Sequence, residues 1–194
     1  MSESWKKISP NDLKQLLEKL ESPWWIAGGY GIDLWLGQNT REHGDIDITL
    51  FRENFEKLFF LSSKFEFYIA NKDGLRKLNL ISDLKTNDWN IWVKNTGEQE
   101  WLFQCLISDE KFGKWIYRRN ININRDKKLF GLTLENGNNV IAPEIQLLFK
   151  SRTLEEKDEA DFKKCLKYLN NDQKIWLRES LLITSPDHPW INQL

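Results

Sequence analysis

The chain has 194 residues and a mass of 23.2 kDa, and its 28 basic and 29 acidic side chains leave a formal net charge of −1. Such a balance gives no overall field that would attract nucleic acid or an anionic membrane. No stretch approaches the roughly 18 uninterrupted apolar residues of a membrane span, and the N-terminus lacks the apolar core of a signal peptide. We therefore expect one compact, cytoplasmic protein.

The first predicted element is a helix that begins at Pro10. Ser9 is suited to the N-cap, Pro10 to the first helical position, and Asp12 to the third position as a capping-box partner. Leucines at positions 13, 16, 17 and 20 follow helical spacing and predict a buried stripe. Ser22-Pro23 would end the helix before a short apolar strand, Trp24 to Ala27.

Gly28-Gly29 follows that strand directly, and a short helix from Tyr30 to Leu36, closed by Gly37, comes next. Glycines let the backbone approach a phosphate closely and point N–H groups at it. The first turn of the following helix would face the same phosphates.

Asp45-Ile46-Asp47-Ile48 alternates acid and aliphatic side chains with the period of a strand. Asp45 and Asp47 would then project together, while the isoleucines point into a core. Neighbouring carboxylates repel each other unless a cation lies between them, and Mg²⁺ takes such oxygen ligands together with substrate phosphates. An isolated Asp-x-Asp is usually a polar strand face, but its occurrence beside Gly28-Gly29 indicates a metal–nucleotide site.

Three other polar residues near this site have two interpretations each. Asp33 would either cap or face its helix or help to bind substrate. Arg41 would bind a phosphate or hold an acid of the site, and His43 would orient a carboxylate or lie on the surface.

The remaining patterns predict further helices and strands. Helices are expected at 54–63, from Pro143, at 158–169 and at 174–183; strands or strand-like pieces are expected at 65–69, 78–81, 89–93, 101–107, 114–119, 120–124 and, as a hairpin turning at Asn136-Gly137, 130–141. Cys105 and Cys165 lie in apolar patterns without metal-ligand spacing, which indicates buried free thiols in a reducing compartment. The expected fold class is α/β (α+β), with a mixed sheet in residues 1–142 and a small helical subdomain in residues 143–194.

Several of these motifs, in this order, resemble the aminoglycoside-2''-adenylyltransferase-like branch of the DNA polymerase β nucleotidyltransferase superfamily. The matching segments are 28–37, 40–47, 115–119, 142–150 and 157–162. The resemblance implies that Asp45 and Asp47 are catalytic metal ligands for Mg²⁺, and that Gly28 and Gly29 contact a nucleoside triphosphate. Arg41 and Lys150 are candidates for the same phosphates.

Some residues in the later motifs have less specific interpretations. Arg118 and Arg119 are basic neighbours that would also serve the phosphates, and Glu144 would only complement the dipole of its helix. Lys157-Asp158 and Asp161 would cap and pair ions on an exposed, charged helix start.

The resemblance also implies a third carboxylate on a neighbouring strand, where this chain offers only Gln104. A neutral amide cannot act as a base. Glu100, just before the strand, and Asp109, just after it, are the nearest acids and would have to turn inward.

Three functions follow. The first is a Mg²⁺-dependent nucleotidyltransferase that moves AMP from ATP to a hydroxyl of a small acceptor, such as an aminoglycoside-like compound. The second, motivated by Gln104, is a nucleotide-binding module with weak or no transfer. The third is a transferase acting on tRNA or protein through the basic residues Arg118, Arg119, Arg125, Lys127 and Lys128, although the net charge argues against a nucleic-acid partner. The acceptor, the nucleotide and the oligomeric state stay open.

Overall fold

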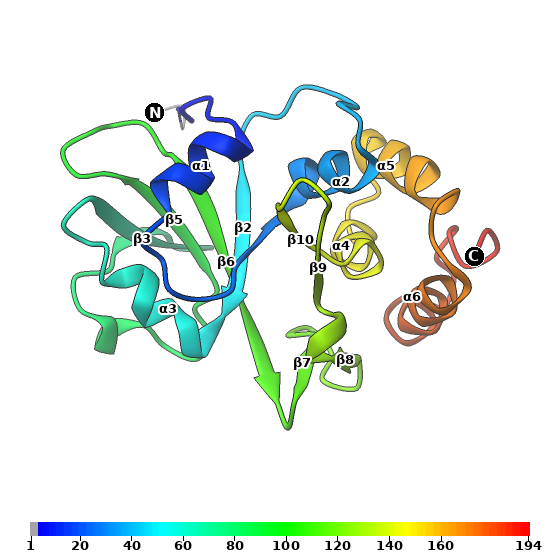
Figure 1. The fold of residues 1–194 in the computed structure, drawn as a ribbon. Helices are drawn as coiled ribbons and strands as arrows, with labels where there is room; N and C mark the ends of the chain where they lie inside the picture. The colour runs from blue at the N-terminus through cyan, green and yellow to red at the C-terminus, as the bar shows by residue number, and fades with distance from the viewer. Residues whose placement is uncertain (1–3) are drawn as a thin grey trace.

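The computed structural model describes residues 4–194, in which ten strands form one mixed sheet (Figure 1). The strand order is β4-β3-β5-β6-β2-β1-β10-β9, and β7 and β8 extend from β6 as a small antiparallel branch. The strands are β1 (Trp25–Ala27), β2 (Asp47–Phe51), β3 (Phe65–Asn71), β4 (Gly74–Lys77), β5 (Asn90–Asn95), β6 (Phe103–Lys111), β7 (Lys114–Ile116), β8 (Asn124–Asp126), β9 (Gly131–Thr133) and β10 (Asn139–Ile141). The predicted mixed sheet flanked by helices is confirmed.

Helices cover the sheet in two groups. In Figure 1, α1 and α3 lie on one side of the molecule, and α2, α4, α5 and α6 lie on the other. The α-helices are α1 (Pro10–Leu16), α2 (Gly28–Leu36), α3 (Arg52–Phe59), α4 (Pro143–Lys150), α5 (Glu156–Leu166) and α6 (Asn171–Thr184). Each group has its own hydrophobic core: leucines and phenylalanines of α1 and α3 pack with β2, β3, β5 and β6, and the other helices pack around Phe51, Trp115 and Phe130.

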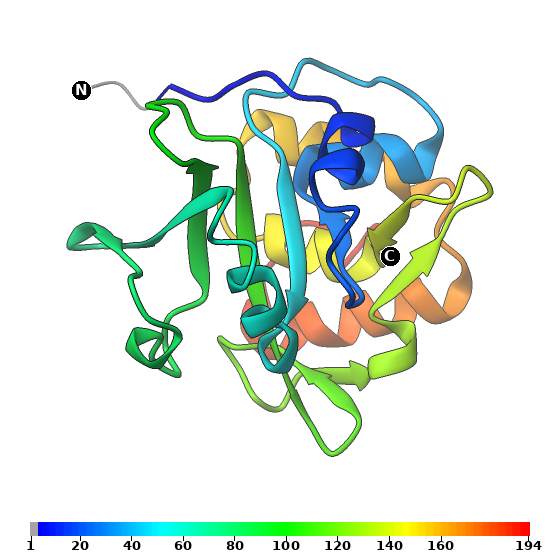
Figure 2. The ribbon, with the colours of Figure 1, turned by 60° about the vertical axis from the view of Figure 1, so that its left-hand side comes forward.

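The central strand β2 separates these two cores. Ile46, Ile48 and Leu50 are buried in the core of α1 and α3, as the alternating pattern predicts, whereas Phe51 belongs to the other core. Strand β2 runs antiparallel to β1, with Asp47 opposite Ala27. It runs parallel to β6, beside it in Figure 2, with Asp47 opposite Gln104. The first residue of β2 therefore lies where the ends of three strands meet.

Several predicted bounds differ from the structure. Helix α1 has the predicted capping box at Ser9 but ends at Leu16, six residues before the predicted end at Ser22-Pro23. Helix α2 begins at Gly28, so the two glycines form its first turn instead of preceding it. Residues 78–80 form no strand, and the edge strand is β4 at Gly74–Lys77, because cross-strand pairing with β3 decides the edge and local propensity does not. The hairpin of β9 and β10 is confirmed.

The predicted division at residue 142 falls between β10 and α4. One hydrophobic core extends across it, from Ala27 and Ile32 to Ile145 and Phe162, so the C-terminal helices pack directly on the sheet. Whether residues 143–194 form a separate subdomain stays a prediction. Cys105 and Cys165 are buried and free, as predicted. Within residues 4–194, no helix is both long and apolar enough to cross a bilayer.

Candidate active site

Residues that the sequence singles out for chemistry surround one cavity of about 570 Å³, here called the glycine cavity. Its lining includes all six predicted site residues, which are Gly28, Gly29, Arg41, Asp45, Asp47 and Lys150. They come from the first turn of α2, the loop after it, the start of β2 and the end of α4. The fold thus brings residues more than a hundred positions apart to one place, and their chemical roles stay predictions.

Gly28 and Gly29 lie so close to neighbouring side chains that there is no room for a Cβ at either position. Gly28 has a φ of +64°, a left-handed conformation that favours glycine, and a Cβ there would collide with Oδ2 of Asp47. A Cβ on Gly29 would collide with the ring of His43 and lie 2.6 Å from Nη2 of Arg41. The Gly28 N–H donates a 2.8 Å hydrogen bond to Oε1 of Gln146. The glycine pair therefore allows acidic and basic side chains to reach the start of α2.

The two aspartates differ in their surroundings. Asp47 is the first residue of β2 and is partly buried, whereas Asp45 precedes the strand and is exposed. The prediction that both aspartates lie in the strand therefore holds for Asp47 only. Burial, and secondarily the negative charge of Asp45, raises the pKa of Asp47 to about 7, and Lys150 opposes this rise. A carboxylate in such a place is costly to ionise without a cation.

The donor chemistry of this pair fits Mg²⁺. Both side chains line the glycine cavity, and no hydrogen-bond donor among residues 4–194 contacts either carboxylate, so their oxygens are available as ligands. No cluster of three or more His, Cys, Asp or Glu side chains suited to a metal exists in the same described residues. The other ligands of a bound Mg²⁺ would therefore have to be water, phosphate or a neutral protein oxygen.

Lys150 lies at the end of α4 but is not a solvated helix end. Its side chain is 9% exposed, and its ammonium contacts Asp158 at 2.7 Å and Asp161 at 2.8 Å. The prediction that these two acids lie on an exposed helix start was wrong, because both are buried in the first two turns of α5, while their predicted ion pairing is confirmed. Arg41 lies 3.8 Å from the same Asp161. The cations of the cavity are thus held in place by buried acids.

His43 and Asp33 form a second fixed pair beside the cavity. The His43 ring is 5% exposed, lies against Tyr30 at 4.4 Å between ring centroids, and its Nε2 is 2.7 Å from Oδ2 of Asp33. Asp33 also accepts hydrogen bonds from the backbone N–H and hydroxyl of Thr40. Asp33 therefore anchors the loop before β2 and orients His43, which is not a surface residue.

The strand position predicted for a third carboxylate carries an amide. Gln104 pairs in register with Asp47 and donates a 2.6 Å hydrogen bond to Oδ1 of Asn90. The two nearest acids do not replace it: Glu100 accepts a hydrogen bond from Ser4, and Asp109 is held by Arg52. Both acids contact other partners, because Glu100 and Asp109 lie beyond the two ends of the pairing between β6 and β2.

Two further cavities continue from the glycine cavity. A central cavity of about 260 Å³ shares Gly28, Asp47, Gln146 and Phe149 with it and is also lined by Gln104. The arginine cavity, about 630 Å³, adjoins the central one through Trp89, Arg118 and Arg119. Arg118 and Arg119 therefore line the central cavity together with Asp47, whereas Lys150 lines the glycine cavity but not the other two.

Glu144 and Arg125 belong to a different network. Glu144 is buried, pairs with Arg125 at 2.9 Å and accepts a hydrogen bond from Gln173 of α6. Burial raises the pKa of Glu144. Arg125 also pairs with Asp172, and Lys127 pairs with Glu53 and Glu110. These residues tie β8, α4 and α6 together, so Glu144 does more than complement a helix dipole.

Sequence patterns missed two residues of the site, Gln146 and Phe149. Both line the glycine and central cavities, and Gln146 binds the Gly28 N–H. Gln146 precedes Lys150 by four positions, which places both side chains on one face of a helix. That spacing was the signal that could have identified Gln146; an aromatic side chain such as Phe149 carries no comparable signal.

Comparison with known proteins agrees with this geometry. The family model of aminoglycoside-2''-adenylyltransferase matches residues 11–73, which contain the glycines and both aspartates. No curated protein matches the chain. Among solved structures, the lincosamide antibiotic adenylyltransferase LnuA, lincomycin-bound, has a TM-score of 0.55 at 20% identity, covering 82% of this chain and 97% of that one. ANT(2'')-Ia in complex with adenylyl-2''-tobramycin has a TM-score of 0.57 at 14% identity, covering 90% and 99%.

The matching family and both solved structures are nucleotidyltransferase enzymes. The resemblance inferred from the motifs is confirmed in residues 11–73, and the two solved structures share the overall fold of most of the chain. Residues 11–73 therefore resemble the aminoglycoside-2''-adenylyltransferase family, and the chain shares the fold of these adenylyltransferases.

Proposed function

We propose that the protein is a Mg²⁺-dependent nucleotidyltransferase that moves AMP from ATP to a hydroxyl group of a small acceptor. The observation that carries this proposal is the convergence of Gly28, Asp47 and Lys150 on one cavity. A triphosphate site needs backbone N–H groups, fixed basic side chains and carboxylates that hold a metal. The lining of the glycine cavity contains the two glycines, Lys150 and the two aspartates that would fill these roles.

In this function, Asp45 and Asp47 would hold Mg²⁺, which supplies charge neutralisation for the phosphates and the leaving pyrophosphate. The first turn of α2 would contact the phosphates through its N–H groups. Lys150 and Arg41 would donate hydrogen bonds to phosphate oxygens without having to move, because Asp158 and Asp161 already fix Lys150, and Asp161 lies beside Arg41. His43, oriented by Asp33, would close the cavity over Gly29.

Calorimetry with Mg²⁺ and a non-hydrolysable ATP analogue tests the nucleotide site, and pyrophosphate release with an acceptor panel tests transfer. Asp47→Asn should reduce transfer by about 10³-fold, the size typical of removing one group that stabilises charge in a transition state. Asp83→Asn, at an exposed aspartate outside the cavities, is the matched control and should leave the rate unchanged. Failure of wild-type protein to bind the nucleotide in the presence of Mg²⁺ would remove the basis of the proposal.

The second candidate is a nucleotide-binding module with weak or no transfer, and Gln104 is the observation that favours it. A neutral amide opposite Asp47 replaces the carboxylate that the resemblance implies as base for the acceptor hydroxyl. This candidate expects nucleotide binding as above but no pyrophosphate release with any acceptor.

A transferase that acts on tRNA or protein has less support. The basic residues predicted to bind such a partner include Arg125 and Lys127, and both form ion pairs with acids of this chain. Transfer of labelled AMP to RNA or protein in a cell extract would distinguish it from the first proposal.

A further inference from the structure

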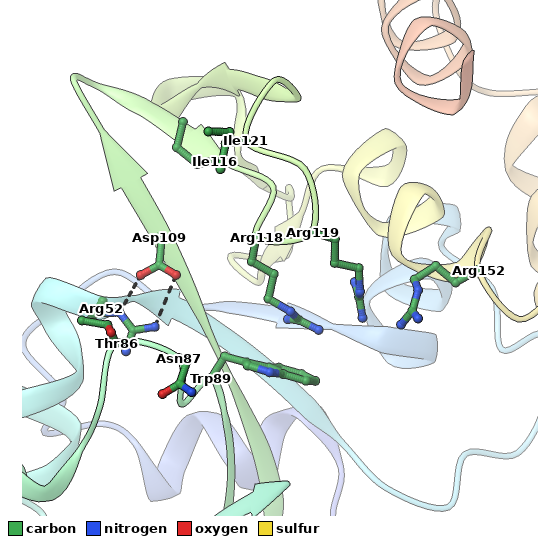
Figure 3. A pocket seen from close by; sticks show the side chains of 10 residues that line it. All are labelled: Arg52, Thr86, Asn87, Trp89, Asp109, Ile116, Arg118, Arg119, Ile121 and Arg152. Atoms are coloured by element: carbon green, nitrogen blue, oxygen red, sulfur yellow. Dashed lines mark hydrogen bonds and ion pairs between the residues drawn. The ribbon is translucent and has the colours of Figure 1, made fainter. Parts of the chain in front are cut away.

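The lining of the arginine cavity is rich in positive charge, although the cavity lies near Asp45 and Asp47. Figure 3 shows Arg118 and Arg119 extending from the loop after β7, and Arg152 from the end of α4, all three pointing toward the sheet. The lining contains one carboxylate, Asp109, and it is neutralised by Arg52 through contacts of 2.5 and 3.3 Å. The cavity therefore has an excess of positive charge.

These three arginines have no acidic partner within residues 4–194. The guanidinium of Arg118 lies 3.2 Å from the ring centroid of Trp89, and that of Arg119 lies 5.6 Å from the ring of Tyr117. Aromatic faces hold the side chains in place but do not neutralise them. Burial, and then the charges of Arg119 and Arg152, lowers the pKa of Arg118 to about 9. An anion in the cavity would relieve this repulsion.

The position of the cavity indicates which reactant it receives. Gly29, Arg41 and Lys150, which are predicted to contact the phosphates, line the glycine cavity and not the arginine cavity. Arg118 and Arg119, for which the sequence also predicted phosphate contacts, line the arginine cavity instead. The central cavity, which Asp47 lines, joins the two. In nucleotidyl transfer the acceptor hydroxyl attacks in line, from the side opposite the leaving pyrophosphate. With the pyrophosphate on the Lys150 side, the acceptor approaches from the arginine side.

We propose, resting on the transferase function above, that the arginine cavity binds the acceptor and that this acceptor is a small hydroxyl compound carrying an anionic group, a phosphate or a carboxylate. A polycationic aminoglycoside is excluded from this cavity by the like charges of Arg118, Arg119 and Arg152. Arginine is suited to planar, two-point recognition of both anionic groups.

The test is residue-resolved protection from phenylglyoxal, which modifies accessible arginines, on the full chain with Mg²⁺ and α,β-methylene-ATP present. Four matched sugars differ mainly in charge: glucose 6-phosphate, glucuronate, glucose and glucosamine. Inorganic phosphate serves as an anion without the sugar scaffold. We expect the anions to slow modification of Arg118, Arg119 and Arg152 several-fold, with no effect of glucose or glucosamine and none at Arg178, an exposed arginine of α6.

The double variant Arg119→Glu and Arg152→Glu should lose this anion preference while keeping its affinity for the nucleotide analogue, and Arg178→Glu should keep both. Protection of the three arginines by the nucleotide analogue alone would overturn the proposal, because the cavity would then belong to the nucleotide. Equal protection by glucosamine, or no protection by any anion, would also overturn it. Failure of the wild-type protein to bind the nucleotide analogue in calorimetry would instead refute the transferase function. The anion site would then be tested by whether inorganic phosphate alone protects the three arginines from phenylglyoxal.

Discussion

The glycine cavity and the arginine cavity are joined by the central cavity, which Asp47 lines, but their cations are held in opposite ways. In the glycine cavity, Lys150 is fixed by Asp158 and Asp161, so its charge is balanced within the chain. In the arginine cavity, Arg118, Arg119 and Arg152 have no acidic partner among the described residues. A lysine fixed by two acids would suit the nucleotide, which is the same reactant in every turnover. Arginines without acidic partners would instead favour acceptors that carry a negative charge. In the functions proposed above, the glycine cavity would take the nucleotide and the arginine cavity would select the acceptor.

The largest expected effect is on stability. Lys150→Met would leave Asp158 and Asp161 buried without their main cation, and should lower the free energy of unfolding by about 3–5 kcal/mol. Arg152→Met removes a cation of the arginine cavity that has no acidic partner, and should change stability by less than about 0.5 kcal/mol. Urea unfolding of both variants measures the difference. Equal losses would show that the two cavities do not differ in how their charges are held.

The raised pKa of Asp47 predicts a pH dependence of stability in the metal-free protein. The folded pKa of about 7 lies above the ordinary value of 3.8, so the native state holds a proton that the unfolded chain releases. Stability from this group is complete below about pH 4 and is lost as the pH rises through 7, by up to about 4 kcal/mol at 1.36 kcal/mol per unit.

Urea unfolding with EDTA at several pH values, for wild type and Asp47→Asn, isolates this effect because all other titrating groups are shared. The wild type should lose stability relative to the variant between pH 5 and 8, and Mg²⁺ should reduce the loss. A constant difference across this range would contradict the burial of Asp47 as the cause.

Gln104→Glu separates the transferase from the nucleotide-binding module. A carboxylate opposite Asp47 would add a base or metal ligand, and general bases typically contribute about 10²–10⁴-fold to rate. We expect pyrophosphate release to rise at least about tenfold if the missing acid limits turnover. Gln104→Leu is the control for simple repacking. An unchanged rate in the glutamate variant would indicate that another group already removes the acceptor proton.

The smallest expected effect concerns the start of α2. Gln146→Ala removes the acceptor of the Gly28 N–H and should cost about 1 kcal/mol of stability without nucleotide. Because a phosphate would offer that N–H a new acceptor, the loss should shrink when Mg²⁺ and the ATP analogue are bound. Gln15→Ala, at an exposed glutamine of α1, is the matched control for thermal unfolding.

Much of the site was readable from short-range patterns. Gly28-Gly29 after an apolar strand, and the alternation around Asp47, are local features whose geometry follows from strand period and glycine freedom. The capping box at Ser9 and the turn at Asn136-Gly137 are local for the same reason. The sequence predictions were wrong at two places where tertiary packing sets the bounds of an element. These are the end of α1 and the position of the edge strand β4 at residues 74–77.

The class of fold and the Gly28-Gly29 and Asp45-x-Asp47 motifs could be predicted from the sequence because each depends on neighbours a few positions apart. Arg41 and Lys150 were named through the resemblance to a family whose motifs recur in order along the chain. Only the tertiary structure decided that Asp158 and Asp161 are buried against Lys150, that Asp33 orients His43, and that three arginines form a cavity of their own. Burial and charge pairing join segments far apart in the chain. No pattern of neighbouring residues in the sequence predicts which basic side chain forms an ion pair in the folded protein and which has no acidic partner.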